Sequence, residues 1–363
     1  MEKFDYYFKC EVQMKTNKDY ITLWLILCLI VNVAIAYSQE MLRVGEVTAD
    51  PGEKKSGFII VPAGMDGPEV HIPVTVVNGM KDGPILALTA GIHGYEYPPV
   101  LALQRLRKQL EPSQLSGSVI LVHVVNVPAF MKRTVYYNPY DWKNQNRGFP
   151  GKKNGTMTER IAYHISKEVI DRCDVLIDNH CGDGNEDLTT YLYYTEIGQP
   201  LVDRKTRDLA IHYGFKMIIL QKVKASDSGA SWCANSALFK GKPALTVESG
   251  RLGRTDEEDI QAILKGSYNI LKRLEMIPGQ PERIFDPIWV KKTTYVRSEY
   301  EGLFYPLVKG GEHVEKGELV GYLTNFWGDV IQKAHAPHDG IVMYIISTPP
   351  MSKGEPMVKI GGF

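Results

Sequence analysis

The chain has 363 residues and carries 42 Lys and Arg against 42 Asp and Glu, so its formal net charge is zero. Hydrophobic residues at 44% and charged residues at 23% are typical of globular proteins, and they exclude a disordered, collagen-like or multi-span membrane chain. Zero net charge also excludes the electrostatic pattern of proteins that bind nucleic acids or anionic membranes. A length above roughly 300 residues indicates more than one domain.

An almost wholly apolar segment, Ile21–Ala36, lies near the N-terminus. Lys15 and Lys18 precede it, and it ends in Ala-Ile-Ala, with small residues at the two positions that a signal peptidase reads. The segment is shorter than the roughly 20 residues that a spanning helix needs. We therefore predict a secretory signal peptide over residues 1–36, export of the mature protein, and no stable membrane span after cleavage. An uncleaved anchor is the alternative.

Cleavage would leave three cysteines, Cys173, Cys181 and Cys233. Three cysteines in a chain of this length are no disulfide framework and allow at most one bridge. We expect buried thiols that act as small hydrophobic side chains.

The first half of the chain changes its hydrophobic pattern near residue 85. Before that point, residues 41–80 contain short alternating or apolar runs between Gly, Asp and Pro, which is typical of strands joined by turns. After it, strands alternate with helices, which predicts an α/β sheet flanked by helices. The strands that we expect in this part are residues 85–90, 119–126, 175–178 and 244–247.

Two helix starts are marked by the sequence. Pro98 and Pro99 open a helix whose leucines share one face. Thr156 and Glu159 resemble a capping box at the start of a second helix. Beyond residue 295 no helical stripe is found, and short strands separated by Gly predict a small all-β module. We place a domain boundary near residue 285, which gives domains at 37–285 and 286–363.

Polar residues follow three of the expected strands. His93 and Glu96 come after the strand at 85–90, His180 follows the strand at 175–178, and Glu248 follows the strand at 244–247. Ligands of open α/β sheets gather at the carboxyl ends of strands. Two imidazoles and one carboxylate are the ligand set of a catalytic zinc that keeps an open position. Each residue alone is usually structural, so the prediction rests on their combination.

The loop at residues 144–151 reads NQNRGFPG. One interpretation is a Gly/Pro turn with a solvated arginine. The other is a pair, Asn146 and Arg147, that binds a substrate carboxylate, because guanidinium matches a carboxylate bidentately.

These motifs together resemble the succinylglutamate desuccinylase/aspartoacylase family of M14-type enzymes. The residues that carry the resemblance are, in order, His93-Gly-Tyr-Glu96, Asn146-Arg147-x-Phe-Pro-Gly, Asp178-Asn-His180 and Pro243–Glu248. The resemblance covers roughly residues 45–363. It implies a zinc-carboxypeptidase-like mixed β-sheet sandwiched by helices, with a C-terminal all-β barrel-sandwich-like domain that closes over the site.

The resemblance implies one Zn²⁺ per chain, held by His93, Glu96 and His180, with Glu248 as the general base. Asp178 precedes His180 by two residues, and two roles stay open for it: orienting the imidazole, or a hydrogen bond at the strand end.

The resemblance also assigns the substrate-carboxylate site to Asn146 and Arg147. It places an arginine that polarises the scissile carbonyl in the stretch before that loop. Arg133 is the candidate for this role, although its spacing to Asn146 is longer than is usual in the family. Gln145 stands where the family has an apolar residue, which is a departure in the same loop.

The implied activity is hydrolysis of an amide bond in an N-acylated amino acid or a related small amide. The alternative is an exported zinc carboxypeptidase that acts on peptides or cell-wall stem peptides, and a third hypothesis is a non-catalytic binding protein. The β-rich tail favours the deacylase. The expected partner is a small-molecule or short-peptide substrate with a carboxylate; nucleic acid is not expected, and a homo-oligomer is compatible with the sequence.

Overall fold

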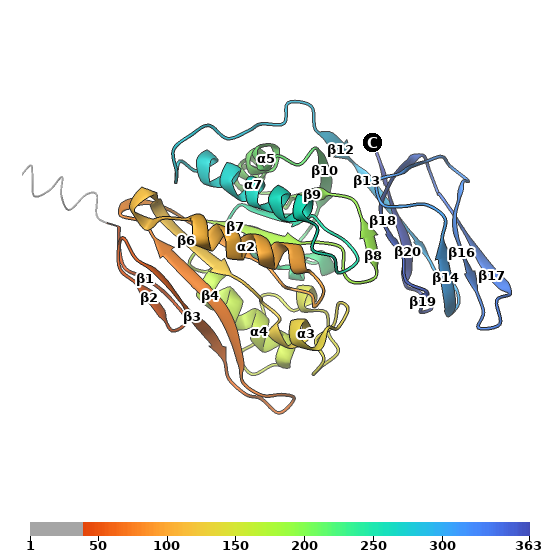
Figure 1. Ribbon diagram of the computed structural model, residues 1–363, viewed down its shortest axis with the longest axis horizontal. Coiled ribbons are helices and arrows are strands. Elements are labelled where there is room, and N and C mark those ends of the chain that lie inside the picture. Colours follow the sequence, from red (N-terminus) through yellow and green to blue (C-terminus); the bar gives the residue numbers. More distant parts are fainter. Residues whose placement is uncertain (1–38) are drawn as a thin grey trace, which may run out of the picture.

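The computed structural model describes residues 39–363, so the predicted signal peptide at 1–36 lies outside the described residues. Among these residues, no helix combines the length and the apolar character that crossing a membrane requires. Figure 1 shows a large sheet with helices on it, followed toward the C-terminus by a region built from strands alone.

A nine-stranded mixed sheet forms the centre of the molecule, in the order β12-β10-β9-β11-β7-β5-β6-β4-β3. Strand β5 runs parallel to β6 and β7, and β7 runs parallel to β11, so the carboxyl ends of β5, β7 and β11 meet at one edge of the sheet. A small hairpin of β1 (Leu42–Val44) and β2 (Val47–Ala49) precedes the sheet. The strands of the sheet are β3 (Lys54–Val61), β4 (Val70–Asn78), β5 (Lys81–Thr89), β6 (Ser116–Val122), β7 (Val175–His180), β9 (Tyr191–Glu196), β10 (Met217–Lys222), β11 (Ala244–Glu248) and β12 (Ile288–Val290).

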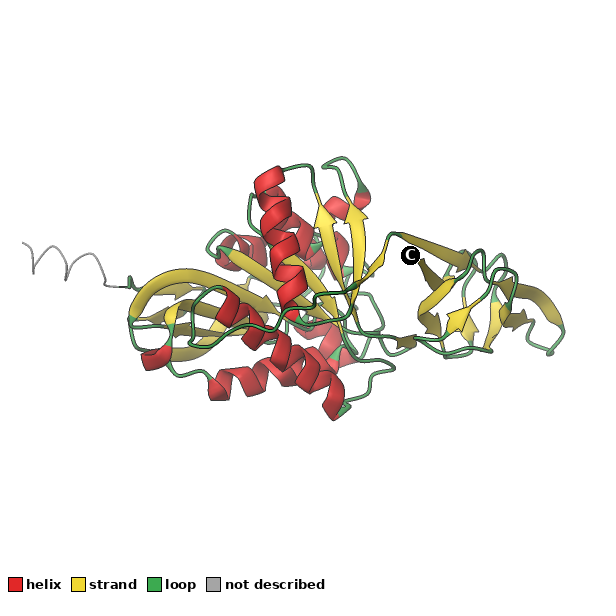
Figure 2. Cartoon of the chain, turned by 90° about the horizontal axis from the view of Figure 1, so that it is seen from above, coloured by secondary structure: helices red, strands yellow, loops and turns green. Residues whose placement is uncertain are grey.

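Helices cover both faces of this sheet (Figures 1 and 2). The apolar sides of α2 (Tyr97–Gln109), α5 (Pro200–Tyr213) and α7 (Glu257–Arg273) belong to one buried cluster, and those of α4 (Met157–Ile165) and α6 (Cys233–Phe239) belong to another. This arrangement confirms the predicted α/β class with a sheet sandwiched by helices. The shorter helical segments are η1 (Pro112–Gln114), α3 (Val127–Lys132), η2 (Gln145–Arg147), η3 (Ser166–Ile170) and η4 (Ser228–Ser231).

Local sequence signals account for two of the helix starts. Prolines stand in the first turn of α2, where a missing N–H costs nothing. At the start of α4 the predicted capping box is present, with the Thr156 N–H donating to Glu159 Oε2 at 2.9 Å. The expected strand at 119–126 is too long, because β6 ends at Val122 and the side chain of Asn126 caps α3 by accepting from the Ala129 N–H at 3.3 Å.

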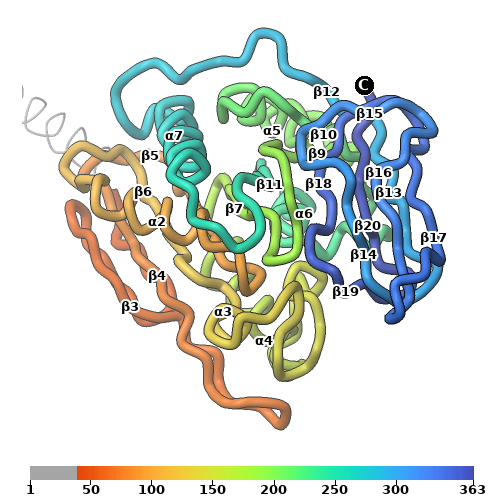
Figure 3. Tube along the Cα trace, turned by 45° about the vertical axis from the view of Figure 1, so that its right-hand side comes forward, coloured from red at the N-terminus to blue at the C-terminus, as the bar shows by residue number. Residues whose placement is uncertain are grey.

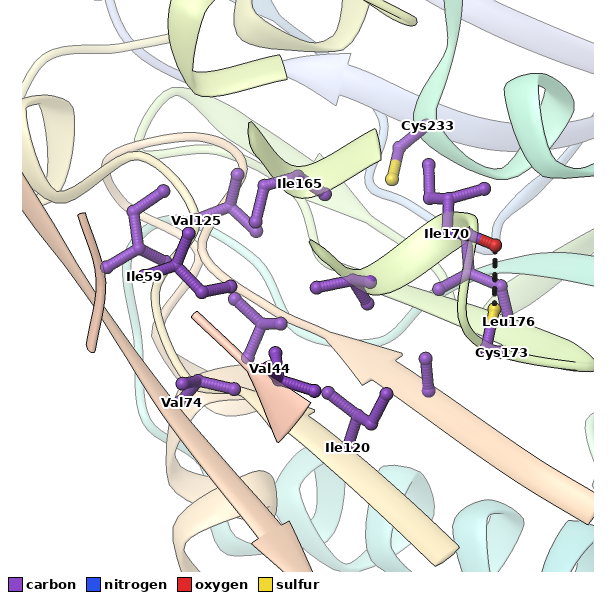
Figure 4. Close-up of a cluster of buried hydrophobic side chains, with 14 of the residues drawn as sticks. Val44, Ile59, Val74, Ile120, Val125, Ile165, Ile170, Cys173, Leu176 and Cys233 are labelled. Carbon is purple, nitrogen blue, oxygen red and sulfur yellow. Dashed lines mark hydrogen bonds between the residues drawn. The ribbon is translucent and has the colours of Figure 1, made fainter. Parts of the chain in front are cut away.

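Figure 4 shows part of the buried cluster on the α4 side of the sheet, where branched aliphatic side chains from the strands meet those of α4 and η3. Cys173 and Cys233 lie in this cluster, and Cys173 Sγ contacts the Ile170 carbonyl oxygen at 3.6 Å. All three cysteines of the described chain are buried and free, which confirms that they act as small hydrophobic side chains.

Two further sheets form the C-terminal part, as the strand pattern predicted. One has the order β13-β20-β18-β15, and the other has the order β17-β16-β14-β19. The predicted boundary near residue 285 stays a prediction; the next strand, β12, still belongs to the central sheet, where it pairs with β10. The strands are β13 (Lys292–Arg297), β14 (Gly302–Pro306), β15 (His313–Val314), β16 (Leu319–Thr324), β17 (Val330–His335), β18 (Gly340–Ile346), β19 (Pro350–Met351) and β20 (Pro356–Gly362).

The C-terminal sheets and the central sheet share a core. β8 (Glu186–Leu188) lies early in the chain, between β7 and β9, yet it pairs antiparallel with β18. Side chains of β9 and β10 belong to the same buried cluster as those of β14, β18 and β20. Figure 3 shows the C-terminal strands beside β9 and β10. The C-terminal part is therefore packed directly against the edge of the sheet that carries the strand ends described next.

Candidate active site

The three predicted metal ligands come from two neighbouring strand ends. His93 follows β5 in a turn that begins at Gly91, whose φ of 67° favours glycine. Glu96 is the residue before α2, and His180 is the last residue of β7. Because β5 and β7 are adjacent and parallel, their carboxyl ends bring these three residues together.

The three side chains converge on one point. Glu96 Oε1 lies 2.8 Å from His93 Nδ1 and 3.0 Å from His180 Nδ1, and one ligand atom from each residue lies within 4.8 Å of the others. Glu96 and His180 are buried. Burial opposes the ionisation of Glu96, but the adjacent His180 and His93 outweigh it and lower the pKa of Glu96 to about 2. Glu96 is therefore an anion at neutral pH.

The opposite nitrogen of each imidazole already has a partner. His93 Nε2 lies 3.2 Å from Asn144 Oδ1, and His180 Nε2 lies 3.0 Å from Asp178 Oδ2. Without a cation, burial lowers the pKa values of His93 and His180 but Glu96 raises them by more, so Nδ1 of each ring keeps a proton toward Glu96. When a cation replaces these protons, each neutral imidazole donates its one remaining N–H to the outer oxygen and its Nδ1 lone pair binds the cation. A cation between these atoms satisfies all of them, and ligand imidazoles in metal sites are held by outer oxygens in this way. The donor set of two histidines and one carboxylate therefore fits a metal ion such as zinc.

Glu248, the predicted general base, ends β11 and lies in register with His180 of β7. It lines the same cavity as the three ligands. Burial, with the nearby Glu96 and Glu186 carboxylates, raises the pKa of Glu248 well above its ordinary value, against the opposing effects of His180 and Lys359. A carboxyl group with a raised pKa is suited to accept and return a proton near neutral pH.

Asn146 and Arg147 lie in η2, next to the metal-ligand group. Asn146 is buried; its Oδ1 accepts from the Cys233 N–H at 2.8 Å, and its Nδ2 lies 3.5 Å from His180 Nε2. The Arg147 guanidinium donates to the Asn146 carbonyl oxygen at 2.9 Å and stacks over Trp232, 4.7 Å from the ring centroid. Both residues line the cavity, which places the predicted carboxylate-binding pair beside the predicted ligands.

Arg133 is not brought to this cavity. It is the C-cap of α3, in a left-handed conformation with φ 54° and ψ 55°, and its side chain is exposed. The chain turns there, and Val135 and Tyr136 line the cavity instead. The carbonyl-polarising role that the resemblance implies for Arg133 therefore has no supporting contact in the structure.

Tyr136 is a cavity residue that the sequence did not reveal. Its φ of 60° is unusual for a non-glycine residue, and its ring lies edge-on to His93 at 6.2 Å. Its N–H donates to Asp183 Oδ2 at 2.7 Å, and its hydroxyl lies 2.9 Å from both Asn185 Oδ1 and Glu186 Oε1. These contacts come from the loop after β7 and from β8, so no local motif could mark Tyr136.

The cavity that contains these residues has a volume of about 830 Å³. Its metal-ligand end is acidic, and burial raises the pKa of Asp183 to about 6 and that of Glu186 to about 7. Another wall is aromatic and cationic, and the C-terminal part of the chain supplies some of it. The residues of that wall are Arg147, Tyr191, Tyr193, Trp232, Tyr295, Arg297, Tyr344 and Lys353.

The chain is similar to known proteins over most of its length. Residues 82–274, more than half of the chain, match the succinylglutamate desuccinylase/aspartoacylase catalytic domain. The N-alpha-acetyl-L-2,4-diaminobutyric acid deacetylase of Halomonas elongata is 30% identical over 274 residues, which cover 73% of this chain and 78% of that protein.

Solved structures give the same result for the fold. The succinylglutamate desuccinylase/aspartoacylase from Rhodobacter sphaeroides superposes with a TM-score of 0.76 at 26% identity, over 88% of this chain and 98% of that one. The product-bound ectoine utilization protein EutE (DoeB) from Ruegeria pomeroyi has the same fold, with a TM-score of 0.79 at 24% identity, over 90% and 100% of the two chains. The chain therefore belongs to the succinylglutamate desuccinylase/aspartoacylase family.

Proposed function

We propose that this protein is a zinc-dependent hydrolase that removes the acyl group from an N-acylated amino acid or a related small amide. The observation that carries this proposal is the convergence of His93, Glu96 and His180 on one point of a cavity that Glu248 also lines. Membership of a deacylase family supports hydrolysis of an amide bond, and the Halomonas elongata relative is named as a deacetylase of an N-acetylated amino acid.

Zinc, when bound by these three residues, would supply Lewis acidity that lowers the pKa of a water molecule toward neutrality. The chain's own residues do the rest. Asn144 and Asp178 hold the two imidazoles in the tautomer that leaves Nδ1 free. Glu248 accepts a proton from the attacking water and returns it to the leaving nitrogen, which typically contributes about 10²- to 10⁴-fold to the rate.

Substrate positioning falls to the η2 segment. The Arg147 guanidinium is fixed by Trp232 and by the Asn146 carbonyl, so little freedom is lost when it binds a carboxylate of the substrate. The buried Asn146 amide, adjacent to His180, is placed to contact the group beside the scissile bond.

A substrate panel tests this proposal. Purified protein is assayed for zinc and then incubated with N-acyl amino acids, N-acyl amines or sugars, and cell-wall peptides, each with and without a chelator. We expect zinc-dependent release of the acyl group from N-acyl amino acids. Cleavage of the peptides alone would favour the carboxypeptidase and overturn the proposal.

Two variants test the roles of the residues. Glu248→Gln is expected to keep its zinc and to lose turnover, while a His93→Ala/His180→Ala double variant is expected to lose zinc. A zinc-loaded Glu248→Gln protein with an unchanged kcat would reject the role of the base, and retention of zinc by the double variant would reject the metal site.

We also propose that the protein is exported, because an apolar segment with a basic N-terminal flank, Ile21–Ala36, precedes the described residues. Expression of the full chain followed by N-terminal sequencing of exported material tests this proposal. The expected N-terminus lies near Tyr37. Accumulation of uncleaved chain in the membrane fraction would support the anchor instead.

A further inference from the structure

Lys359 of β20 is a buried cation that lies behind the aromatic wall of the cavity, against Tyr193 and Tyr295. Lys359 is 2% exposed, and it forms no ion pair with a carboxylate in the described part of the chain. Lysine is almost never fully buried unless it is paired. Here three aromatic rings surround the ammonium, with Nζ 4.8 Å from the Tyr193 centroid, 5.5 Å from that of Tyr295 and 5.6 Å from that of Tyr191. Cation–π attraction therefore stabilises this charge in the position where it lies.

The ammonium also determines whether the Tyr193 hydroxyl group donates or accepts in their hydrogen bond. Lys359 Nζ donates to the Tyr193 hydroxyl oxygen at 2.5 Å. An ammonium can only donate, so the Tyr193 oxygen is the acceptor and its own O–H is directed elsewhere. Burial raises the pKa of Tyr193 despite the opposing effect of Lys359, so the phenol keeps its proton. Tyr193 lines the cavity, so the O–H that does not face Lys359 is directed either to the neighbouring Tyr191 or to a ligand in the cavity.

Tyr193 lies close to the predicted carboxylate site. Its ring packs edge-on against Trp232 at 5.9 Å, and Trp232 is the ring over which Arg147 stacks. Arg147 is thus on the aromatic wall of the cavity, and Lys359 lies behind the same wall, against Tyr193. A hydrogen bond that an ionised carboxylate accepts is about twice as strong as one between neutral groups.

We propose that Tyr193, polarised by Lys359 from the C-terminal part of the chain, donates a hydrogen bond to the substrate carboxylate that Arg147 binds. Tyr193 is the contact residue, and Lys359 acts through it as a positioning residue. This inference rests on the proposed function and adds a second residue that selects substrates with a carboxylate. The carboxylate belongs either to the amino-acid part or to the acyl part of the substrate, and the kinetic experiment separates these two sources.

The kinetic experiment compares Tyr193→Phe, Lys359→Met and the double variant with wild type. Three substrates are compared: an N-acetyl amino acid, the same compound with a carboxamide in place of its carboxylate, and the N-succinyl amino acid carboxamide, whose only carboxylate is in the acyl part. Because hydrogen bonds to charged groups are stronger than those between neutral groups, we expect KM for the carboxylate substrate to rise about 10- to 100-fold, with kcat little changed and the uncharged substrate unaffected. If the bound carboxylate belongs to the amino-acid part, KM rises for the N-acetyl amino acid. If it belongs to the acyl part, KM rises for the N-succinyl amino acid carboxamide.

Coupling between the two residues is the readout that a merely structural role would not give. Since Lys359 acts through Tyr193, the double variant is expected to match Tyr193→Phe rather than to add the two effects. Tyr305→Phe is the matched control, because Tyr305 stacks on Tyr322 in the other C-terminal sheet and does not line the cavity. Tyr193→Phe keeps the ring that holds the ammonium, so it decides the case alone if Lys359→Met folds poorly.

A binding experiment separates this inference from the proposed function. Titration calorimetry measures the affinity of the zinc-loaded protein for succinate and for uncharged succinamide, with no turnover required. We expect Tyr193→Phe, and not Tyr305→Phe, to weaken succinate at least tenfold and to leave succinamide unchanged. This result without any amide hydrolysis would reject the proposed function and keep the carboxylate site. Hydrolysis by wild type with equal effects of Tyr193→Phe on charged and uncharged ligands would reject the site and keep the function.

Discussion

Asp178 Oδ2 lies 3.0 Å from Nε2 of His180, while Nδ1 of the same ring lies 3.0 Å from Glu96 Oε1. Asp178 also accepts from the Thr89 hydroxyl at 2.6 Å through its other oxygen. Both roles that the sequence left open for Asp178 are therefore present: it is a hydrogen-bonding residue near the strand end, and it holds the imidazole that belongs to the metal-ligand group.

Replacement of Asp178 by Asn tests the second role. The amide can still accept from Thr89, but its NH₂ group then faces His180 Nε2 and favours the tautomer with the proton on Nδ1. We expect the affinity for zinc to fall about 10- to 100-fold, as measured by competition with a chelator. Asp174→Asn, at the other end of β7, is the control and is expected to bind zinc normally. Equal affinities in all three proteins would contradict this role.

Replacement of Arg147 by Lys tests carboxylate binding. Lysine cannot donate two parallel hydrogen bonds or stack its charge flat on Trp232, so we expect KM to rise about 10- to 100-fold with a small change in kcat. Arg207 stacks in the same way on Trp289, at 5.3 Å, outside the cavity. Arg207→Lys is therefore the matched control. Steady-state kinetics of the two variants check the prediction, and an equal change of KM in both would disprove it.

Replacement of Arg133 by Ala tests the role implied by the family resemblance. Because the side chain is exposed and does not line the cavity, we expect kcat/KM to stay within about twofold of wild type. A loss of two orders of magnitude or more would mean that Arg133 reaches the substrate during turnover, and the comparison with Arg147→Lys in the same assay gives the scale.

Stability of the metal-free protein is expected to depend on pH through Glu186. Burial raises the pKa of Glu186 to about 7 in the folded chain, whereas an unfolded glutamate has a pKa of about 4.3. The folded state therefore keeps this proton to higher pH, so the contribution to stability is fully present below about pH 4.3 and is lost as the pH rises through about 7.

The measurement is urea unfolding of wild type and Glu186→Gln at pH 5 and pH 8. Glutamine cannot ionise. The free energy of unfolding of wild type relative to Glu186→Gln is therefore expected to fall by something on the order of 2 kcal/mol from pH 5 to pH 8. Glu301→Gln, at an exposed position, is the control. A difference between wild type and Glu186→Gln that is the same at both pH values would refute this prediction.

The convergence of the candidate metal ligands and the candidate base could be predicted because these residues lie at the ends of readable strands. His93, His180 and Glu248 each come at the end of an apolar run, and parallel neighbours bring such ends together without any knowledge of side-chain packing. The length of a strand was harder to predict: the apolar run at 119–126 continues past Val122 into residues that form a turn and cap α3.

The aromatic wall could not be predicted, because it depends on contacts between distant parts of the chain. Tyr193 and Lys359 are 166 residues apart, and an isolated lysine in a strand gives no signal that it is buried. Tyr136 is held by Asp183 and Glu186 from another loop, so its position depends on tertiary structure alone. Arg133 shows the converse: proximity in sequence to Asn146 did not bring its side chain to the cavity.

The pairing of β8 with β18 restricts how such a chain can be recombined with a relative. A chimera joined near residue 291 would take β18 from one parent and β8 (Glu186–Leu188) from the other, and a mismatched pair would leave an open sheet edge. Glu186 of β8 also holds Tyr136 in the cavity, and β20 carries Lys359. A transplanted C-terminal part would therefore have to bring its own version of the loop after β7, so that the unit of exchange is discontinuous along the chain.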